Sequence, residues 1–135
     1  MKRIWADTNF IIRLVTDDPK EMADRAESFL QKAEAGEFRI VIAPIVVAEC
    51  VWVLTGRYYQ ASKASAVNVL TKFLGNSGLD VLDEVNVLQA LTLMESKRVD
   101  FIDAYLAVQA RSQNESVANF DRDYRKLGVE RVAIE

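Results

Sequence analysis

Histidine is absent from this chain of 135 residues, and cysteine occurs only once, as Cys50. Without histidine, neither a serine–histidine nor a cysteine–histidine nucleophile can be assembled. The lack of histidine also disfavours a zinc site, because zinc binds mainly nitrogen and sulfur ligands. A single cysteine excludes an internal disulfide and indicates a reducing compartment, so we expect a cytoplasmic protein.

Glycine and proline are also scarce, with five and two copies. Neither a GxxxxGK[ST] nor a GxGxxG loop is present, which argues against nucleoside-triphosphate or dinucleotide chemistry. We recognise no signal peptide and no apolar run long enough to span a membrane. No repeat or linker divides the chain, so we expect residues 1–135 to form one domain. The net charge of −3 disfavours indiscriminate nucleic-acid binding, but it leaves open a nuclease with a local basic rim.

Short apolar strands alternate with longer amphipathic segments along the chain. The expected strands are Lys2–Ala6, Arg39–Ala43, Leu79–Leu82, Ser116–Phe120 and Arg131–Ile134. The expected helices are Phe10–Thr16, Lys20–Ala35, a helix from Pro44 to Gly56, Ser62–Leu74, a helix capped by Asp83 and running to Lys97, Asp100–Gln113 and the brief Arg122–Leu127. This alternation predicts an α/β fold with a mainly parallel sheet, whose ligand crevice lies beyond the carboxyl ends of the strands.

Three carboxylates each stand alone in an apolar run. Asp7 is the only charge in residues 4–12, Glu49 the only charge between Arg39 and Arg57, and Asp103 the only charge in residues 101–110. A buried carboxylate is costly unless a counter-charge compensates it, and none of these runs contains a lysine or arginine. A divalent cation would compensate several such groups together, and oxygen-only ligands suit Mg²⁺ or Mn²⁺.

Each carboxylate also has a simpler interpretation. Asp7 could be a helix N-cap, and Asp100 and Asp103 have the spacing of a capping box. Glu49 could form a buried pair with an arginine from elsewhere, because apolar residues share its predicted helix face. In the metal-site interpretation, Asn9 and Asp100 do not bind the metal themselves but orient the side chains that do.

Asp121 and Asp123 follow the fourth expected strand in a charge-rich stretch that could equally be a solvated loop. Four acids around one or two Mg²⁺ ions suit the cleavage of a phosphodiester by water. Such a nuclease needs basic side chains to hold phosphates, and Arg13, Arg57 and Arg122 are the candidates.

At these positions the chain resembles the PIN domain family, and within it the VapC-type toxins of bacterial and archaeal toxin–antitoxin pairs. The resemblance covers essentially the whole chain. The matching segments are Asp7-Thr8-Asn9, Ala48-Glu49, Asp100-Phe101-Ile102-Asp103-Ala104 with Ala107, and Asn119-Phe120-Asp121-Arg122-Asp123-Tyr124.

The resemblance implies a three-layer α/β/α sandwich whose five-stranded sheet has the order 3-2-1-4-5, and a Mg²⁺- or Mn²⁺-dependent endoribonuclease. It implies an acidic quartet of metal ligands and catalytic residues at Asp7, Glu49, Asp103 and Asp121. In some relatives the last acid lies two residues later, which is Asp123 here. Where the family commonly has Thr or Ser, two residues before the last acid, this chain has Asn119.

The resemblance also implies an RNA substrate, a homodimer and a small antitoxin that often inserts a basic side chain into the acidic pocket. Apolar side chains of the second and third expected helices, and Tyr58-Tyr59, would supply the contact surfaces. Two other functions stay open. One is a catalytically silent PIN-like assembly module whose acids are caps. The other is a receiver-like signalling domain, which is disfavoured because a single aspartate follows the first strand.

Overall fold

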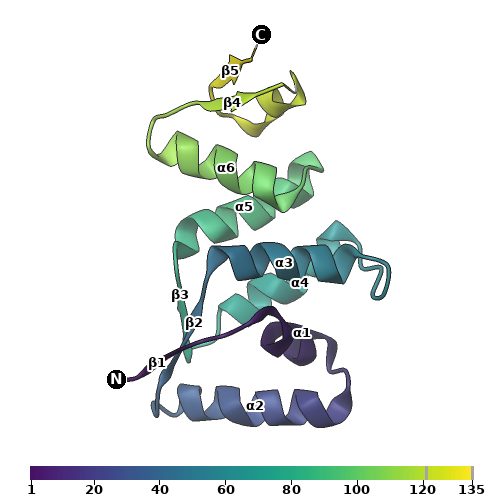
Figure 1. Cartoon of the computed structure of the whole chain (residues 1–135), viewed down its shortest axis with the longest axis vertical. Coiled ribbons are helices and arrows are strands. Elements are labelled where there is room, and N and C mark those ends of the chain that lie inside the picture. The colour runs from purple at the N-terminus through teal and green to yellow at the C-terminus, as the bar shows by residue number, and fades with distance from the viewer. Residues whose placement is uncertain (121, 135) are drawn as a thin grey trace. The chain divides into compact units, whose positions relative to one another are not determined.

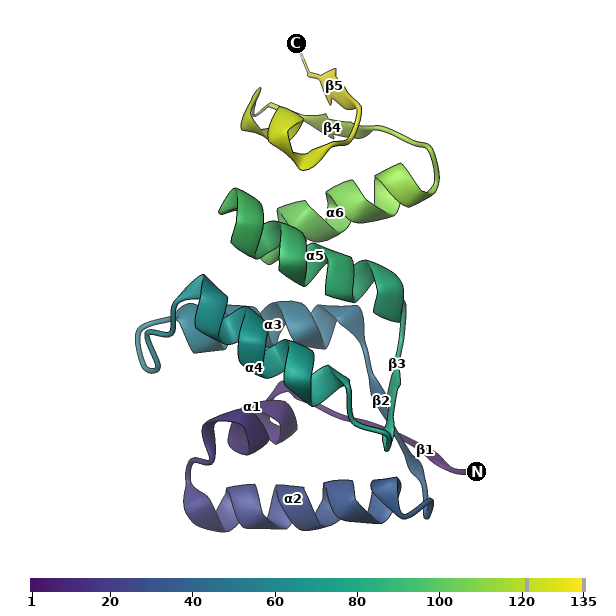
Figure 2. The same ribbon diagram turned by 180° about the vertical axis from the view of Figure 1, so that it is seen from behind.

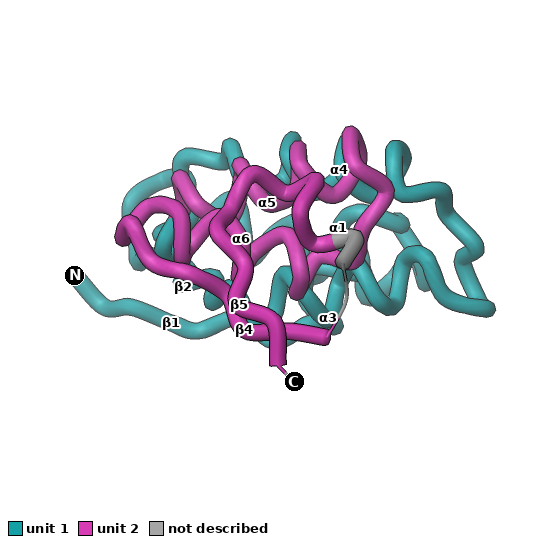
Figure 3. The backbone as a smooth tube through the Cα atoms, turned by 90° about the horizontal axis from the view of Figure 1, so that it is seen from above, with its two compact units in different colours: residues 1–83 teal, residues 84–135 magenta. Residues whose placement is uncertain are grey.

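The computed structural model describes residues 1–120 and 122–134, and the side chains of Arg122 and Asp123 are not among those described. The chain divides into two compact units, which Figure 3 colours separately. Unit 1 is Met1–Asp83 and unit 2 is Glu84–Glu135. Each unit is described by itself below.

Unit 1 contains a parallel three-stranded sheet in the order β1-β2-β3, formed by β1 (Arg3–Trp5), β2 (Arg39–Ile42) and β3 (Leu79–Val81). The central strand β2 is apolar throughout its last three residues, and these are at most 1% exposed. Within this sheet β1 is an edge strand, and Trp5 is 60% exposed. Within this unit, β1 pairs with a neighbouring strand on one side only.

Four helices complete unit 1. They are α1 (Thr8–Thr16), α2 (Lys20–Glu34), α3 (Pro44–Thr55) and α4 (Lys63–Leu74). Figures 1 and 2 show α1 lying between α2 and the pair α3 and α4, in agreement with the contacts of α1 with both α2 and α3. Pro44 begins α3 at a position where its missing N–H costs nothing, and the Ser62 side chain caps α4 by accepting a hydrogen bond from Ser65 N. These helices place the end of β1 beside α1 and α3.

Unit 2 consists of α5 (Glu84–Lys97), α6 (Phe101–Ser112), β4 (Val117–Asn119), the 3₁₀ helix η1 (Arg122–Leu127) and β5 (Arg131–Ala133). Helices α5 and α6 pack on each other, and β4 pairs with β5 in parallel. A small core forms where Ala107 of α6 meets Tyr124 and Leu127 of η1. This core fixes η1 against the helix that carries Asp103.

The predicted α/β class is confirmed, and every expected strand and helix is present with its ends shifted by at most two residues. The observed parallel pairings reproduce the 3-2-1 and 4-5 parts of the expected strand order. The joining of these parts into one five-stranded sheet, and the single domain over residues 1–135, stay predictions. No helix among the described residues is both long and apolar enough to cross a membrane.

Candidate functional site

Asp7 lies where β1 gives way to α1. The N–H of Ala6 still donates to the Val41 carbonyl oxygen at 3.0 Å, so the chain keeps its sheet geometry up to the residue before Asp7. Asp7 itself is the N-cap of α1, and its Oδ1 accepts a hydrogen bond from Phe10 N at 2.9 Å. The capping interpretation of Asp7 therefore holds for one carboxylate oxygen. The side chain is exposed, so its second carboxylate oxygen can bind a ligand at the carboxyl end of the sheet.

Glu49 lies on the exposed face of α3, whereas the sequence predicted a buried stripe around it. Ile45 and Trp52 on the same face are 78% and 79% exposed. The helix buries its opposite side instead, through Val47, Cys50, Val51 and Leu54. Because α3 is apolar on almost every side, its sequence does not specify which face packs, and the cost of desolvating the glutamate favours an outward position.

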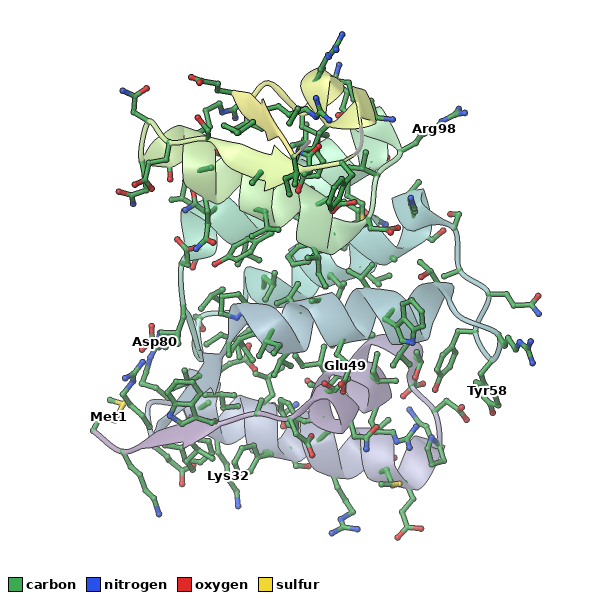
Figure 4. All side chains as sticks on the ribbon, turned by 45° about the horizontal axis from the view of Figure 1, so that its top comes forward. Met1, Lys32, Glu49, Tyr58, Asp80 and Arg98 are labelled. Atoms are coloured by element: carbon green, nitrogen blue, oxygen red, sulfur yellow. The ribbon has the colours of Figure 1, made fainter. Side chains whose placement is uncertain are left out.

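The negative charges of Asp7 and Glu49 both act on the buried thiol of Cys50. This thiol is fully buried, and burial raises its pKa to about 12, with further contributions from the negative charges of Glu49 and Asp7. Both carboxylates are therefore close enough to act on one sulfur atom. Figure 4 shows the Glu49 side chain extending from α3 toward α1. Among the described residues, neither carboxylate forms an ion pair with a lysine or arginine.

A cleft opens between α1 and α2 beside Asp7. Its volume is about 490 Å³. The residues that line it are Asp7, Asn9, Phe10, Arg13, Met22, Arg25, Ala26 and Phe29. Asn9, the predicted supporting residue, thus shares this cleft with Asp7, whereas Glu49 does not line it. Arg13 was a predicted phosphate-binding residue, but nothing in the sequence singled out Arg25, which reaches the cleft from the other helix.

In unit 2, Asp103 lies in the first turn of α6 and is half-buried. The Tyr124 hydroxyl donates to the main-chain oxygen of Asp103 at 3.0 Å. Burial, the Asp103 charge and hydrogen bonding to Asp103 together raise the pKa of Tyr124 to about 12, and burial contributes most. Asp100 occupies the N-cap position, but its side chain makes no capping hydrogen bond, so the expected capping box does not form. Tyr124 had no predicted role, although it ends the last matching segment.

Asn119 ends β4 and is held by an arginine from β5. Arg131 Nε donates to Asn119 Oδ1 at 2.6 Å. The Asn119 amide nitrogen is buried and has no hydrogen-bond partner among the described residues. Asp121, the predicted fourth acid, lies outside the described residues, and so does the side chain of its alternative, Asp123.

The chemistry of this donor set fits a hard divalent cation. Among the described residues, Asp7 and Glu49 have no competing ammonium or guanidinium partner for their carboxylate oxygens, and the sequence has no histidine to select zinc. Within neither unit do the described residues bring together three His, Cys, Asp or Glu side chains that could hold a metal. A complete ligand set would therefore have to combine Asp7 and Glu49 with the acids of unit 2, and this convergence stays a prediction.

Comparison with known proteins identifies the family. The PIN domain family matches residues 4–130, so the chain belongs to the PIN domain family, whose members are generally nucleases. Among solved structures, the chain is similar to a VapBC2 complex from Rickettsia felis bound to a DNA fragment from the promoter of these proteins. The similarity has 16% sequence identity and a TM-score of 0.38, and it covers 98% of each chain. No curated protein matches the sequence.

Proposed function

We propose that this chain is a Mg²⁺- or Mn²⁺-dependent endoribonuclease that hydrolyses RNA, and that it is the VapC-like toxin of a cytoplasmic toxin–antitoxin pair. The observation that carries the proposal is the pair Asp7 and Glu49. They come from different elements, the charges of both contribute to the raised pKa of Cys50, and neither has a cationic partner among the described residues. Two adjacent uncompensated carboxylates repel each other, and a divalent ion offsets that repulsion.

In this proposal each acid has a defined task. Asp7 keeps its Oδ1 on the helix N-terminus, which fixes the rotamer and directs the other oxygen to the ligand site. Glu49 contributes from α3, and Asp103 and Asp121 complete the quartet. A bound Mg²⁺ or Mn²⁺ would lower the pKa of a water and stabilise the charge that develops on the phosphate. The Tyr124 hydroxyl, bonded to the Asp103 main chain, holds the first turn of α6 and thus orients the Asp103 carboxylate.

The proposal includes a homodimer and a small antitoxin as partners. Unit 1 exposes large apolar side chains, with Ile45, Trp52 and Tyr58 each at least 78% exposed. Tyr58 projects from the turn after α3 in Figure 4. Exposed aromatic groups of this size are typical of surfaces that associate. An antitoxin arginine would also pair well with the carboxylates of Asp7 and Glu49.

The decisive test is cleavage of a mixture of structured and single-stranded RNAs by the purified protein. We expect cleavage with Mg²⁺ or Mn²⁺, none with a chelator, and loss of activity in Asp7→Asn, Glu49→Gln and Asp103→Asn. Glu34→Gln, an exposed glutamate at the end of α2, is the matched control and should cleave like the wild type. Circular dichroism should show the same fold in all variants.

Either of two results would contradict the proposal. Cleavage that survives Asp7→Asn and Asp103→Asn unchanged would assign the activity to another site or to a contaminant. A protein that cleaves none of the RNAs in the presence of Mn²⁺ would favour the catalytically silent assembly module.

A further inference from the structure

The cleft between α1 and α2 contains groups that the hydrolytic mechanism does not use. It shares Asp7 with the proposed catalytic site, but two arginines and an apolar wall form the rest of it. Arg13 comes from α1 and Arg25 from α2. Among the described residues, Asp7 is the only acid that lines the cleft, so with the two arginines this lining carries a net positive charge of one.

Arg13 is incompletely bonded where it stands. Its Nη1 donates one long hydrogen bond, 3.3 Å to the main-chain oxygen of Asp18. Its Nε is buried and has no partner among the described residues, and neither Arg13 nor Arg25 forms an ion pair there. An unsatisfied buried N–H is costly, so an anion that allowed this guanidinium to turn and bond fully would be favoured. Arg25 is exposed on the facing helix and can meet the same anion.

The groups follow one another along α1 in a fixed order. Asp7, Phe10 and Arg13 are spaced three residues apart, at steps of about 4.5 Å along the helix axis, and all three line the cleft. Phe10 contacts Phe29 of α2 edge to face, with ring centroids 5.8 Å apart. Met22 of α2 is 45% exposed and lines the cleft. The cleft therefore presents, in order along α1, the carboxylate of Asp7, an apolar wall formed by Phe10 and Met22, and the guanidinium of Arg13.

This order matches a nucleotide better than it matches other ligands. A base packs against aromatic and apolar side chains, and a phosphate is the group that an arginine fork binds best. The cleft volume of about 490 Å³ lies within the usual range of small-ligand sites, about 300–1,000 Å³. A protein segment would also meet the apolar wall, but it would supply a negative charge to both guanidinium groups only where it carries an acidic side chain.

We propose that the α1–α2 cleft holds the RNA nucleotide next to the scissile bond, with Arg13 and Arg25 on its phosphate and its base against Phe10 and Met22. The inference rests on the proposed ribonuclease function, because Asp7 is what links the cleft to the reacting phosphate. Arg13 and Arg25 are then positioning residues, which set where along the strand the RNA is cut.

The test measures RNA binding without cleavage. A fluorescent single-stranded RNA is titrated with the full chain in a chelator, and anisotropy is followed at several salt concentrations. Arg25→Gln and Arg13→Gln should each weaken binding, and together they should reduce the slope of log K against log salt by about 0.7, the value for one phosphate contact on a single strand. Lys32→Gln removes a positive charge from the same helix two turns away, where the side chain projects outward (Figure 4), and should leave the slope unchanged.

Three outcomes separate this inference from the proposed function. If the wild type cleaves RNA while Arg25→Gln binds RNA with the same affinity and salt slope, the cleft does not bind RNA, and the proposed ribonuclease function still stands. If the wild type binds RNA through both arginines but never cleaves it, the proposed ribonuclease function is wrong, and the cleft remains an RNA-binding site. If both variants bind RNA normally but lose a co-purifying small protein, the cleft holds a protein segment and the inference is wrong. Arg25 is exposed, so its variant keeps the test valid even if Arg13→Gln fails to fold.

Discussion

Replacing Asp7 in two different ways separates its capping role from its proposed catalytic role. Asp7 Oδ1 accepts one hydrogen bond, from Phe10 N at 2.9 Å, at the start of α1. Asparagine caps helices about as well as aspartate, whereas alanine cannot accept this bond. Asp7→Asn should therefore keep the helix and lose only the charge, and Asp7→Ala should lose both.

The expected magnitudes follow from this one bond and one charge. Asp7→Ala should cost about 1 kcal/mol of unfolding free energy, within the range of about 0.5–2 kcal/mol for lost N-caps. For a chain of this length that loss lowers Tm by about 3–5 °C. Asp7→Asn should leave Tm unchanged or slightly higher, because it also removes repulsion with Glu49. Both variants should lose RNA cleavage by more than the roughly 10–100-fold that follows loss of an outer-shell partner.

The assay combines thermal unfolding, followed by circular dichroism in a chelator, with RNA cleavage in Mn²⁺. The reasoning predicts two stable proteins, wild type and Asp7→Asn, of which only the first is active. If Asp7→Asn retained wild-type cleavage while Asp7→Ala lost stability, Asp7 would be a cap and nothing more. If both variants lost the same stability, the assignment of the capping bond would be wrong.

Three further predictions concern metal, Tyr124 and Cys50. Mg²⁺ or Mn²⁺ should raise the Tm of the wild type by mass action but not that of Asp7→Asn/Asp103→Asn, and equal shifts in calorimetry would indicate non-specific ion effects. Tyr124→Phe should cost about 0.5–1.5 kcal/mol in urea unfolding, because it removes the hydrogen bond to Asp103, and an unchanged midpoint would refute that bond's contribution. Folding raises the Cys50 pKa from 9.0 to about 12, so its contribution to stability should be complete below pH 9 and disappear as pH rises toward 12. Cys50→Ala should flatten this alkaline loss, and an identical pH profile would contradict it.

The elements of the fold were accessible from the sequence because local signals agreed with one another. Residues 40–42 are continuously apolar and form the central strand of unit 1, where both strand neighbours and the helices shield them. Pro44 and Gly56 bracket α3, and Ser62 begins α4 with a side-chain cap. The position of Asp7 directly after the first strand placed it at the carboxyl end of the sheet, and the segments around the isolated acids carried the resemblance to the PIN domain family.

Tertiary packing decided what local patterns left undetermined. Helix α3 is apolar around most of its circumference, so periodicity could not show that Cys50 would face inward and Glu49 outward; only the packing of α1 and α4 against it did. On α2, Ala23 is buried whereas the adjacent Met22 is exposed and lines the cleft beside α1. The pairing of Arg13 with Arg25 across that cleft joins residues from two helices, and no spacing in the sequence encodes it. Strand and helix identities follow from short-range chemistry, whereas the face that each helix presents depends on which neighbours compete to cover it.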